Sequence, residues 1–204
     1  MAIQPVDKWI ICFSGYGQTD KFHTGISSLE DAIYRTCASP TVRVELHGWQ
    51  ADIDYLADRI TDRPIGINNP VVIIIAYSWG VATALDLIEE LRRRGYDVAI
   101  LFSSDGISRG PIPWLSFRSL LGPQITLIIP DNVLRVGIWR QKTPGLRNLQ
   151  GSRIILQDAD KTKYIQPPSI SSTTTHSSMD ENKDFRRLAL EFSCPQMAQT
   201  LRNP

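Results

Sequence analysis

Val71-Val72-Ile73-Ile74-Ile75-Ala76-Tyr77-Ser78-Trp79-Gly80 is the most informative stretch of the sequence. Apolar and mainly β-branched residues precede the serine, which is typical of a buried strand. Residues 81–94 carry apolar side chains at helical spacing and are followed by Gly95, so a helix is predicted directly after the strand. The serine therefore lies in a sharp turn at the carboxyl end of the strand, where open α/β sheets bind their ligands.

The rest of the sequence alternates between short apolar runs and helical periodicity. Because alternating strands and helices build mainly parallel sheets, we predict a three-layer α/β/α fold in residues 1–193, followed by a tail in 194–204. Residues 166–178 are rich in Pro, Ser and Thr and are predicted to form a loop. Further strands are predicted at 9–13, 42–46 (at an edge), 97–102, 133–139 and 152–156, and further helices at 25–38, 50–61 and 181–192.

Composition limits the classes of function. The chain has 204 residues, with 22 Lys and Arg against 21 Asp and Glu, and a formal net charge of +1. This balance argues against a dedicated nucleic-acid binder, which should be basic. The longest unbroken apolar run, Val71–Tyr77, is far shorter than the roughly 20 residues of a membrane span. The N-terminal residues do not resemble a secretory signal, so a cytoplasmic location is expected.

The cysteines Cys12, Cys37 and Cys194 are widely separated. No pair has the spacing of metal ligands, so no metal site is expected. The odd number predicts free thiols in a reducing compartment. Cys12 lies within an apolar strand and is expected to be buried and inert.

Ala76-Tyr77-Ser78-Trp79-Gly80 resembles the nucleophile elbow of the α/β-hydrolase family, Gly-x-Ser-x-Gly, with the alanine found in a group of small bacterial lipases. The resemblance extends over about residues 9–192. It implies a minimal α/β-hydrolase fold in which Ser78 is the nucleophile. It also implies an esterase or lipase that cleaves carboxylic esters without a cofactor, acting on a small-molecule ester or acyl substrate. The backbone N–H of Trp79, at the helix N-terminus, is a candidate oxyanion donor.

The family places its base after the nucleophile in chain order, and this selects one histidine. The sequence contains only His23, His47 and His176, and only His176 follows Ser78. The string Thr175-His176-Ser177-Ser178-Met179-Asp180 is similar to the histidine loop of bacterial lipase-like and thioesterase-like hydrolases. His176 is therefore the predicted base.

The acid is less narrowly defined by the resemblance. Many family members carry it after the strand predicted at 133–139, but no carboxylate follows there. Asp105, after the preceding strand, is therefore preferred, as in the pancreatic type of lipase, although it stands before Gly106 and not before a proline. Asp131, Asp158 and Asp160 are the alternatives, and each of the four also suits a turn.

A second oxyanion donor should come from the loop after the first strand of the sheet. Ser14-Gly15-Tyr16-Gly17 lies there, and the N–H of Tyr16 is preferred over those of Gly15 and Gly17. His47-Gly48-Trp49 is expected to form a structural turn, and lining of the pocket is the alternative. Residues 106–124 follow Asp105 and form either a cap over the site or an extra helix packed on the core.

The sequence also allows two other classes of function. The same triad suits a thioesterase or an acyltransferase, and a non-catalytic binding module with the same fold is a third hypothesis. The oligomeric state is not predicted.

Overall fold

A computed structural model describes residues 5–16, 25–63, 68–108, 111–112, 115–118, 125–142, 151–171 and 173–195. For 111–112 and 115–118 only the backbone is described. Within these ranges no helix is long and apolar enough to cross a membrane.

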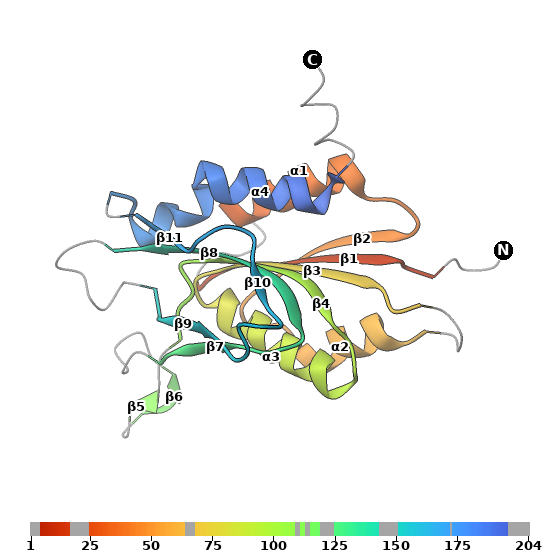
Figure 1. The fold of residues 1–204 in the computed structure, drawn as a ribbon, viewed down its shortest axis with the longest axis horizontal. Helices are drawn as coiled ribbons and strands as arrows, with labels where there is room; N and C mark the ends of the chain where they lie inside the picture. The colour runs from red at the N-terminus through yellow and green to blue at the C-terminus, as the bar shows by residue number, and fades with distance from the viewer. Residues whose placement is uncertain are drawn as a thin grey trace, which may run out of the picture.

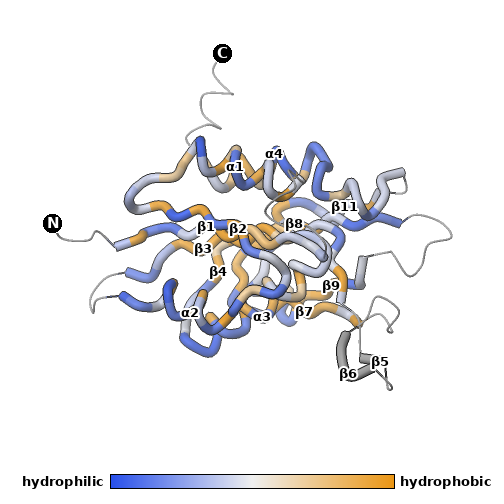
Figure 2. The backbone as a smooth tube through the Cα atoms, turned by 180° about the vertical axis from the view of Figure 1, so that it is seen from behind, coloured by the Kyte–Doolittle hydropathy of each residue, from blue (hydrophilic) through white to orange (hydrophobic). Residues whose placement is uncertain are grey.

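The centre of the molecule is a parallel sheet in the strand order β10-β8-β4-β3-β1-β2, with β11 also paired to β8. Its central strands are almost entirely buried and are the most hydrophobic part of the chain (Figure 2). Parallel strands that are covered on both faces require such continuous apolar runs. The strands are β1 (Lys8–Phe13), β2 (Val42–His47), β3 (Val71–Tyr77), β4 (Val98–Ser104), β8 (Val133–Gln141), β10 (Lys163–Tyr164) and β11 (Ser169–Ser171).

Helices cover both faces of the sheet (Figure 1). Helices α1 (Gly25–Cys37) and α4 (Lys183–Ser193) pack on one face, and α2 (Ile53–Thr61) and α3 (Gly80–Arg93) pack on the other. The core is accordingly divided into two clusters, one on each side of the sheet. The predicted three-layer α/β/α fold with a parallel sheet is confirmed, and β2 lies at one edge of the sheet, as expected.

The smaller predictions have mixed outcomes. The loop predicted at 166–178 contains the strand β11 and the start of a 3₁₀ helix, η2 (His176–Glu181). The strand predicted at 152–156 is confirmed as β9 (Ile154–Leu156), which pairs with β7 (Leu127–Ile129) in a separate small sheet. In the segment 106–124, β5 (Pro111–Ile112) and β6 (Leu115–Arg118) form an antiparallel pair, which is not the extra helix considered above. The other possibility for residues 106–124, a cap over the site, stays a prediction because most of this segment lies outside the described residues.

The cysteines also depart from expectation. Cys37 at the end of α1 and Cys194 after α4 form a disulfide, with their Cα atoms 5.8 Å apart. They are 157 residues apart in sequence and meet because the two helices pack on the same face of the sheet. The expectation of free thiols is therefore wrong for these two and confirmed for the buried Cys12, whose pKa is raised by burial and, secondarily, by the charge of Glu30. The tail predicted from 194 begins with this buried cysteine, and 196–204 lie outside the described residues.

The disulfide predicts a thiol count. Protein purified without reductant and unfolded in guanidinium should react with a thiol reagent at one cysteine per chain, Cys12. Cross-linking two residues so far apart restricts the unfolded chain, so reduction should lower the free energy of unfolding by about 2–4 kcal/mol. Cys37→Ser in the same assay should expose a second thiol, that of Cys194. Three reactive thiols in the wild-type protein would contradict the pairing.

Candidate active site

Ser78 lies in the turn between β3 and α3 and adopts a left-handed conformation, with φ of 56°. Such a φ is uncommon outside glycine, so the turn is strained. Hydrogen bonds fix it: the Ser78 N–H donates to the carbonyl of Ser104 at 3.0 Å, and the Ser78 carbonyl accepts from the N–H of Ile107 at 2.9 Å. The buried Ala76 and the glycine at position 80 give the turn the space that an elbow needs.

Gly80 permits a close approach between α3 and β1. A Cβ atom at this position would lie 2.7 Å from the backbone carbonyl oxygens of Phe13 and Ser14. The first turn of the helix therefore rests on the end of β1, and this contact brings the loop after β1 beside Ser78. The small residue of the motif is thus required by backbone packing.

His176 lies within hydrogen-bonding distance of Ser78, with 2.8 Å between the serine Oγ and the histidine Nε2. It is the first residue of η2, and two side chains hold this loop over the sheet. The Tyr77 hydroxyl donates to the His176 carbonyl, and the Tyr77 ring stacks on the imidazole with centroids 5.2 Å apart. The Ser104 hydroxyl donates to the Met179 carbonyl at 2.9 Å.

Asp105 is fully buried at the end of β4 and is hydrogen-bonded to His176 through its Oδ2 and the histidine Nδ1. Its Oδ1 accepts from the backbone N–H of Gln141 at 3.0 Å. Like Ser78, Asp105 has a positive φ, 45°. Gly151 packs against the same carboxylate, where a Cβ atom would clash with Oδ1. The three side chains Ser78, His176 and Asp105 thus form one hydrogen-bonded series.

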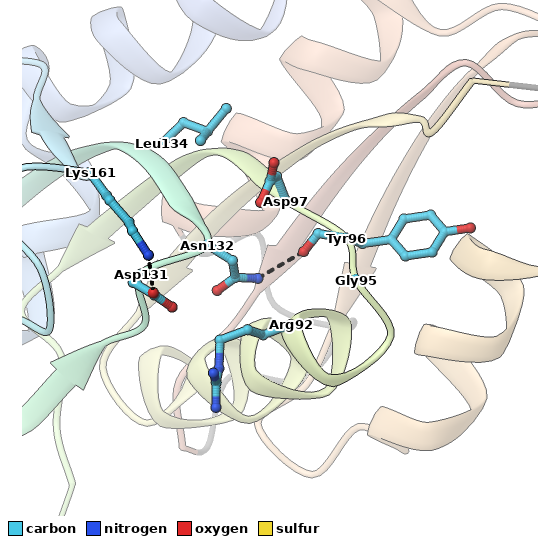
Figure 3. Close-up of a pocket in the computed structure, with 8 residues that line it drawn as sticks. All are labelled: Arg92, Gly95, Tyr96, Asp97, Asp131, Asn132, Leu134 and Lys161. Carbon is cyan, nitrogen blue, oxygen red and sulfur yellow. Dashed lines mark hydrogen bonds and ion pairs between the residues drawn. The ribbon is translucent and has the colours of Figure 1, made fainter.

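The alternative acids lie elsewhere. Asp131 lines a depression of about 440 Å³ with Arg92 and Asn132, and pairs with Lys161 at 2.7 Å (Figure 3). This depression lies where β4 and β8 begin, at the opposite end of the sheet from Ser78 and Asp105. Asp158 accepts hydrogen bonds from the N–H groups of Asp160 and Lys161 in a turn, so it serves the structural role that aspartates in turns have.

The candidate oxyanion donors lie close to the serine. A Cβ atom on Gly15 would lie 2.8 Å from Ser78 Cβ and 3.2 Å from its Oγ, so the backbone after β1 contacts the nucleophile. Tyr16 follows Gly15 with a side chain that is 61% exposed, and Trp79 directly precedes helix α3. Gly17, the third possible donor in this loop, lies outside the described residues.

Of the other two histidines, the structure describes only His47, which lies outside this series. His23 lies outside the described residues. His47 ends β2 and is hydrogen-bonded to Glu45 at 3.0 Å, and Arg59 binds the same carboxylate through two nitrogens. Burial opposes ionisation of Glu45, but the hydrogen bonds from His47 and Arg59 outweigh it and lower its pKa to about 2. This cluster anchors the end of β2.

Sequence reasoning missed the residues that hold the histidine loop. Tyr77 and Ser104 each stand immediately before a member of the series, Ser78 and Asp105. Burial raises the pKa of Tyr77, and the nearby carboxylates of Asp180 and Asp105 raise it further, so its hydroxyl remains a donor. The sequence held a signal for these two residues. Tyr77 and the pair Ser103-Ser104 are the polar ends of two strands that are otherwise apolar.

Comparison with known proteins supports the fold. No protein-family model and no curated protein matches the sequence. The structure of RedJ with a polyethylene glycol molecule in its active site matches with a TM-score of 0.50 at 14% identity, over 95% of each chain. A structure of RedJ as the thioesterase of the prodiginine pathway of Streptomyces coelicolor gives 0.46 at 13% identity, over 95% of this chain and 88% of the other. ClbQ from the colibactin NRPS/PKS pathway gives 0.45 at 13%, over 96% and 98%.

The parallel sheet, its helical layers and the match to RedJ define the class of the protein: the chain has the α/β-hydrolase fold.

Proposed function

We propose that the protein is a serine hydrolase that transfers an acyl group from an ester or thioester to water. The observation that carries this proposal is the hydrogen-bonded series of Ser78, His176 and Asp105. A nucleophile within reach of a base, and a base oriented by a third group, is the arrangement that nucleophilic acyl transfer requires. The series lies at the carboxyl end of the parallel strands, where α/β sheets bind ligands.

The reaction follows from this geometry. The Ser78 Oγ attacks the acyl carbonyl carbon while His176 Nε2 takes its proton, and the buried Asp105 carboxylate stabilises the imidazolium through Nδ1. The tetrahedral intermediate collapses to an acyl-serine, and the departing thiolate or alkoxide takes the proton from Nε2. Water then attacks the acyl-serine with His176 again as base, which releases the carboxylic acid and restores Ser78.

For the oxyanion we propose the backbone N–H groups of Trp79 and Tyr16, with Gly15 as the alternative to Tyr16. Trp79 stands at the start of α3, where the helix dipole favours negative charge. The close contact of Gly15 with Ser78 supports a donor from the loop after β1. In comparable sites the loss of one donor lowers kcat by about 10²–10³-fold.

Thioesters are the substrate class that we propose first. RedJ, whose structure has the same fold, is named as a thioesterase. Carboxylic esters, which the elbow motif favours, are the second candidate, because the same acyl-serine forms from either. A non-catalytic binding module is disfavoured, because the nucleophile, the base and the acid are all present as serine, histidine and aspartate. Hydrogen bonds connect the three side chains. A cytoplasmic location stays a prediction.

A labelling experiment with a rate assay tests the proposal. A fluorophosphonate probe should modify the wild-type protein at Ser78 and leave Ser78→Ala unmodified. The wild-type protein should also hydrolyse acyl thioesters of N-acetylcysteamine or p-nitrophenyl esters of the same acyl groups, and the ratio of kcat/KM values decides between the two substrate classes. No labelling and no hydrolysis of either series would contradict the proposal and favour the binding module.

Tyr77→Phe should lower kcat roughly 10-fold with little change in KM. The variant keeps the ring that stacks on His176 but removes the donor to the part-buried His176 carbonyl. A fully buried acceptor that is left unpaired costs about 1–3 kcal/mol, which is the upper limit here. Tyr55→Phe, which alters a tyrosine that is 58% exposed, is the control and should behave as wild type. An unchanged kcat in Tyr77→Phe would exclude a positioning role for the hydroxyl.

A further inference from the structure

Three aromatic rings form a row beside the nucleophile. The ring centroids of Tyr16 and Trp49 are 5.6 Å apart at an interplanar angle of 45°, and those of Trp49 and Trp79 are 5.8 Å apart at 57°. Both distances fall within the range of favourable aromatic contacts. We call Tyr16, Trp49 and Trp79 the aromatic row.

The two end residues of the aromatic row, Trp79 and Tyr16, each follow directly in the chain a residue of the reacting centre. Trp79 is the residue after Ser78, and Tyr16 is the residue after Gly15, which contacts Ser78. Trp79 is 6% exposed, Trp49 is half-buried and Tyr16 is 61% exposed. Exposure therefore rises along the row from Trp79 to Tyr16, so the row leaves part of its aromatic surface open to a ligand beside the reacting centre.

The middle ring is carried on a segment that is held in place from several sides. The Thr83 hydroxyl on α3 donates to the Trp49 carbonyl, and the N–H of Ala51 donates to the Gly48 carbonyl at 3.1 Å. Just before this turn, the carbonyl of His47 accepts from the N–H of Ser14 at 2.9 Å. The backbone of Trp49 is thus tied to α3, and its ring lies between the rings of Tyr16 and Trp79. A ring held in this way is pre-organised for a ligand.

We propose that Trp49 is a specificity-determining residue of this site and that the aromatic row selects planar aryl acyl groups; the inference rests on the proposed acyl transfer. Tilted rings present both faces and edges, against which another aromatic ring packs edge-to-face or offset. An aliphatic ring of the same size gains a similar apolar contact but lacks the π-system, so it forgoes the additional stabilisation of an aromatic pair.

The test compares two thioesters of N-acetylcysteamine whose acyl groups differ only in the ring. The 3-phenylpropanoyl group carries an aromatic ring, and the 3-cyclohexylpropanoyl group carries a saturated one. The wild-type protein should prefer the phenyl substrate by about 10-fold in kcat/KM. Trp49→Leu should reduce this ratio to near one, whereas Trp49→Phe, which retains an aromatic ring, should keep most of it. Tyr34→Leu changes an exposed aromatic residue on α1 and should leave both the ratio and the rates unchanged.

Three results would overturn the inference. A ratio near one in the wild-type protein would show no selection for aryl groups. An equal fall of both rates in Trp49→Leu and in Trp49→Phe, with the ratio preserved, would show that Trp49 has only a structural role. Failure of the wild-type protein to hydrolyse any ester or thioester, together with no fluorophosphonate labelling, would overturn the proposed function and this inference with it. Hydrolysis without aryl selection overturns the inference alone.

Discussion

Asp105→Asn should lower kcat by about 10⁴-fold, the size of the effect in serine proteases that have the same arrangement. Asp105 accepts a hydrogen bond from His176 Nδ1, which leaves Nε2 free to take the proton of Ser78. An asparagine amide at this position offers a donor in place of the carboxylate and favours the wrong tautomer of the imidazole. It also removes the negative charge that stabilises the imidazolium. Single-turnover kinetics with an activated thioester would measure the loss.

Asp131→Asn is the matched control for this prediction. It makes the same chemical change at another candidate acid, whose carboxylate is occupied by Lys161 at the opposite end of the sheet. Its kcat should stay close to the wild-type value, and both variants should retain the wild-type circular dichroism spectrum. A near-normal kcat in Asp105→Asn together with a collapse in Asp131→Asn would show that the acid is assigned to the wrong residue.

The fold was predictable because its signals are local. The run Val71–Tyr77 is continuous and mainly β-branched, as in a strand that is covered on both faces, and helical periodicity follows it within three residues. The same reasoning located α1, α2 and β4 to within a few residues. The position of His176 came from chain order in the resembled family, and the structure places that residue against Ser78.

The features that could not be predicted depend on contacts between distant parts of the chain. The Cys37–Cys194 pair exists because α1 and α4 pack together, and no spacing in the sequence reports on that packing. β11 is too short to give a recognisable pattern, because Ser169-Ile170-Ser171 holds one apolar residue within a stretch rich in Pro, Ser and Thr. It is a strand through its pairing with the end of β8. The surroundings of Asp105 are equally non-local, because Gln141 and Gly151 reach it from other segments.

Gly80→Ala should lower the free energy of unfolding by about 3 kcal/mol, the upper part of the range for overpacked cores. The new Cβ atom would lie 2.7 Å from two backbone carbonyl oxygens, those of Phe13 and Ser14. Backbone atoms at the end of a central strand cannot rotate away as a side-chain terminus would, so either α3 or β1 must shift. For a chain of this length the loss corresponds to a fall in Tm of about 6–12 °C, which calorimetry or thermal circular dichroism would measure.

Gly48→Ala separates this steric effect from the general effect of adding a methyl group. A Cβ atom on Gly48 meets no other atom within 4 Å, so this variant should unfold within about 2 °C of the wild-type protein. Gly80→Ala and Gly48→Ala should also differ in their effect on the reactivity of Ser78. A shift of α3 away from β1 moves the turn that holds Ser78 relative to Gly15, so fluorophosphonate labelling of folded Gly80→Ala should be slower, whereas that of Gly48→Ala should be unchanged. Equal stability of the two variants would show that the elbow has more room than the backbone contacts at Gly80 indicate, and that the glycine of the motif serves the turn and not the packing of helix on strand.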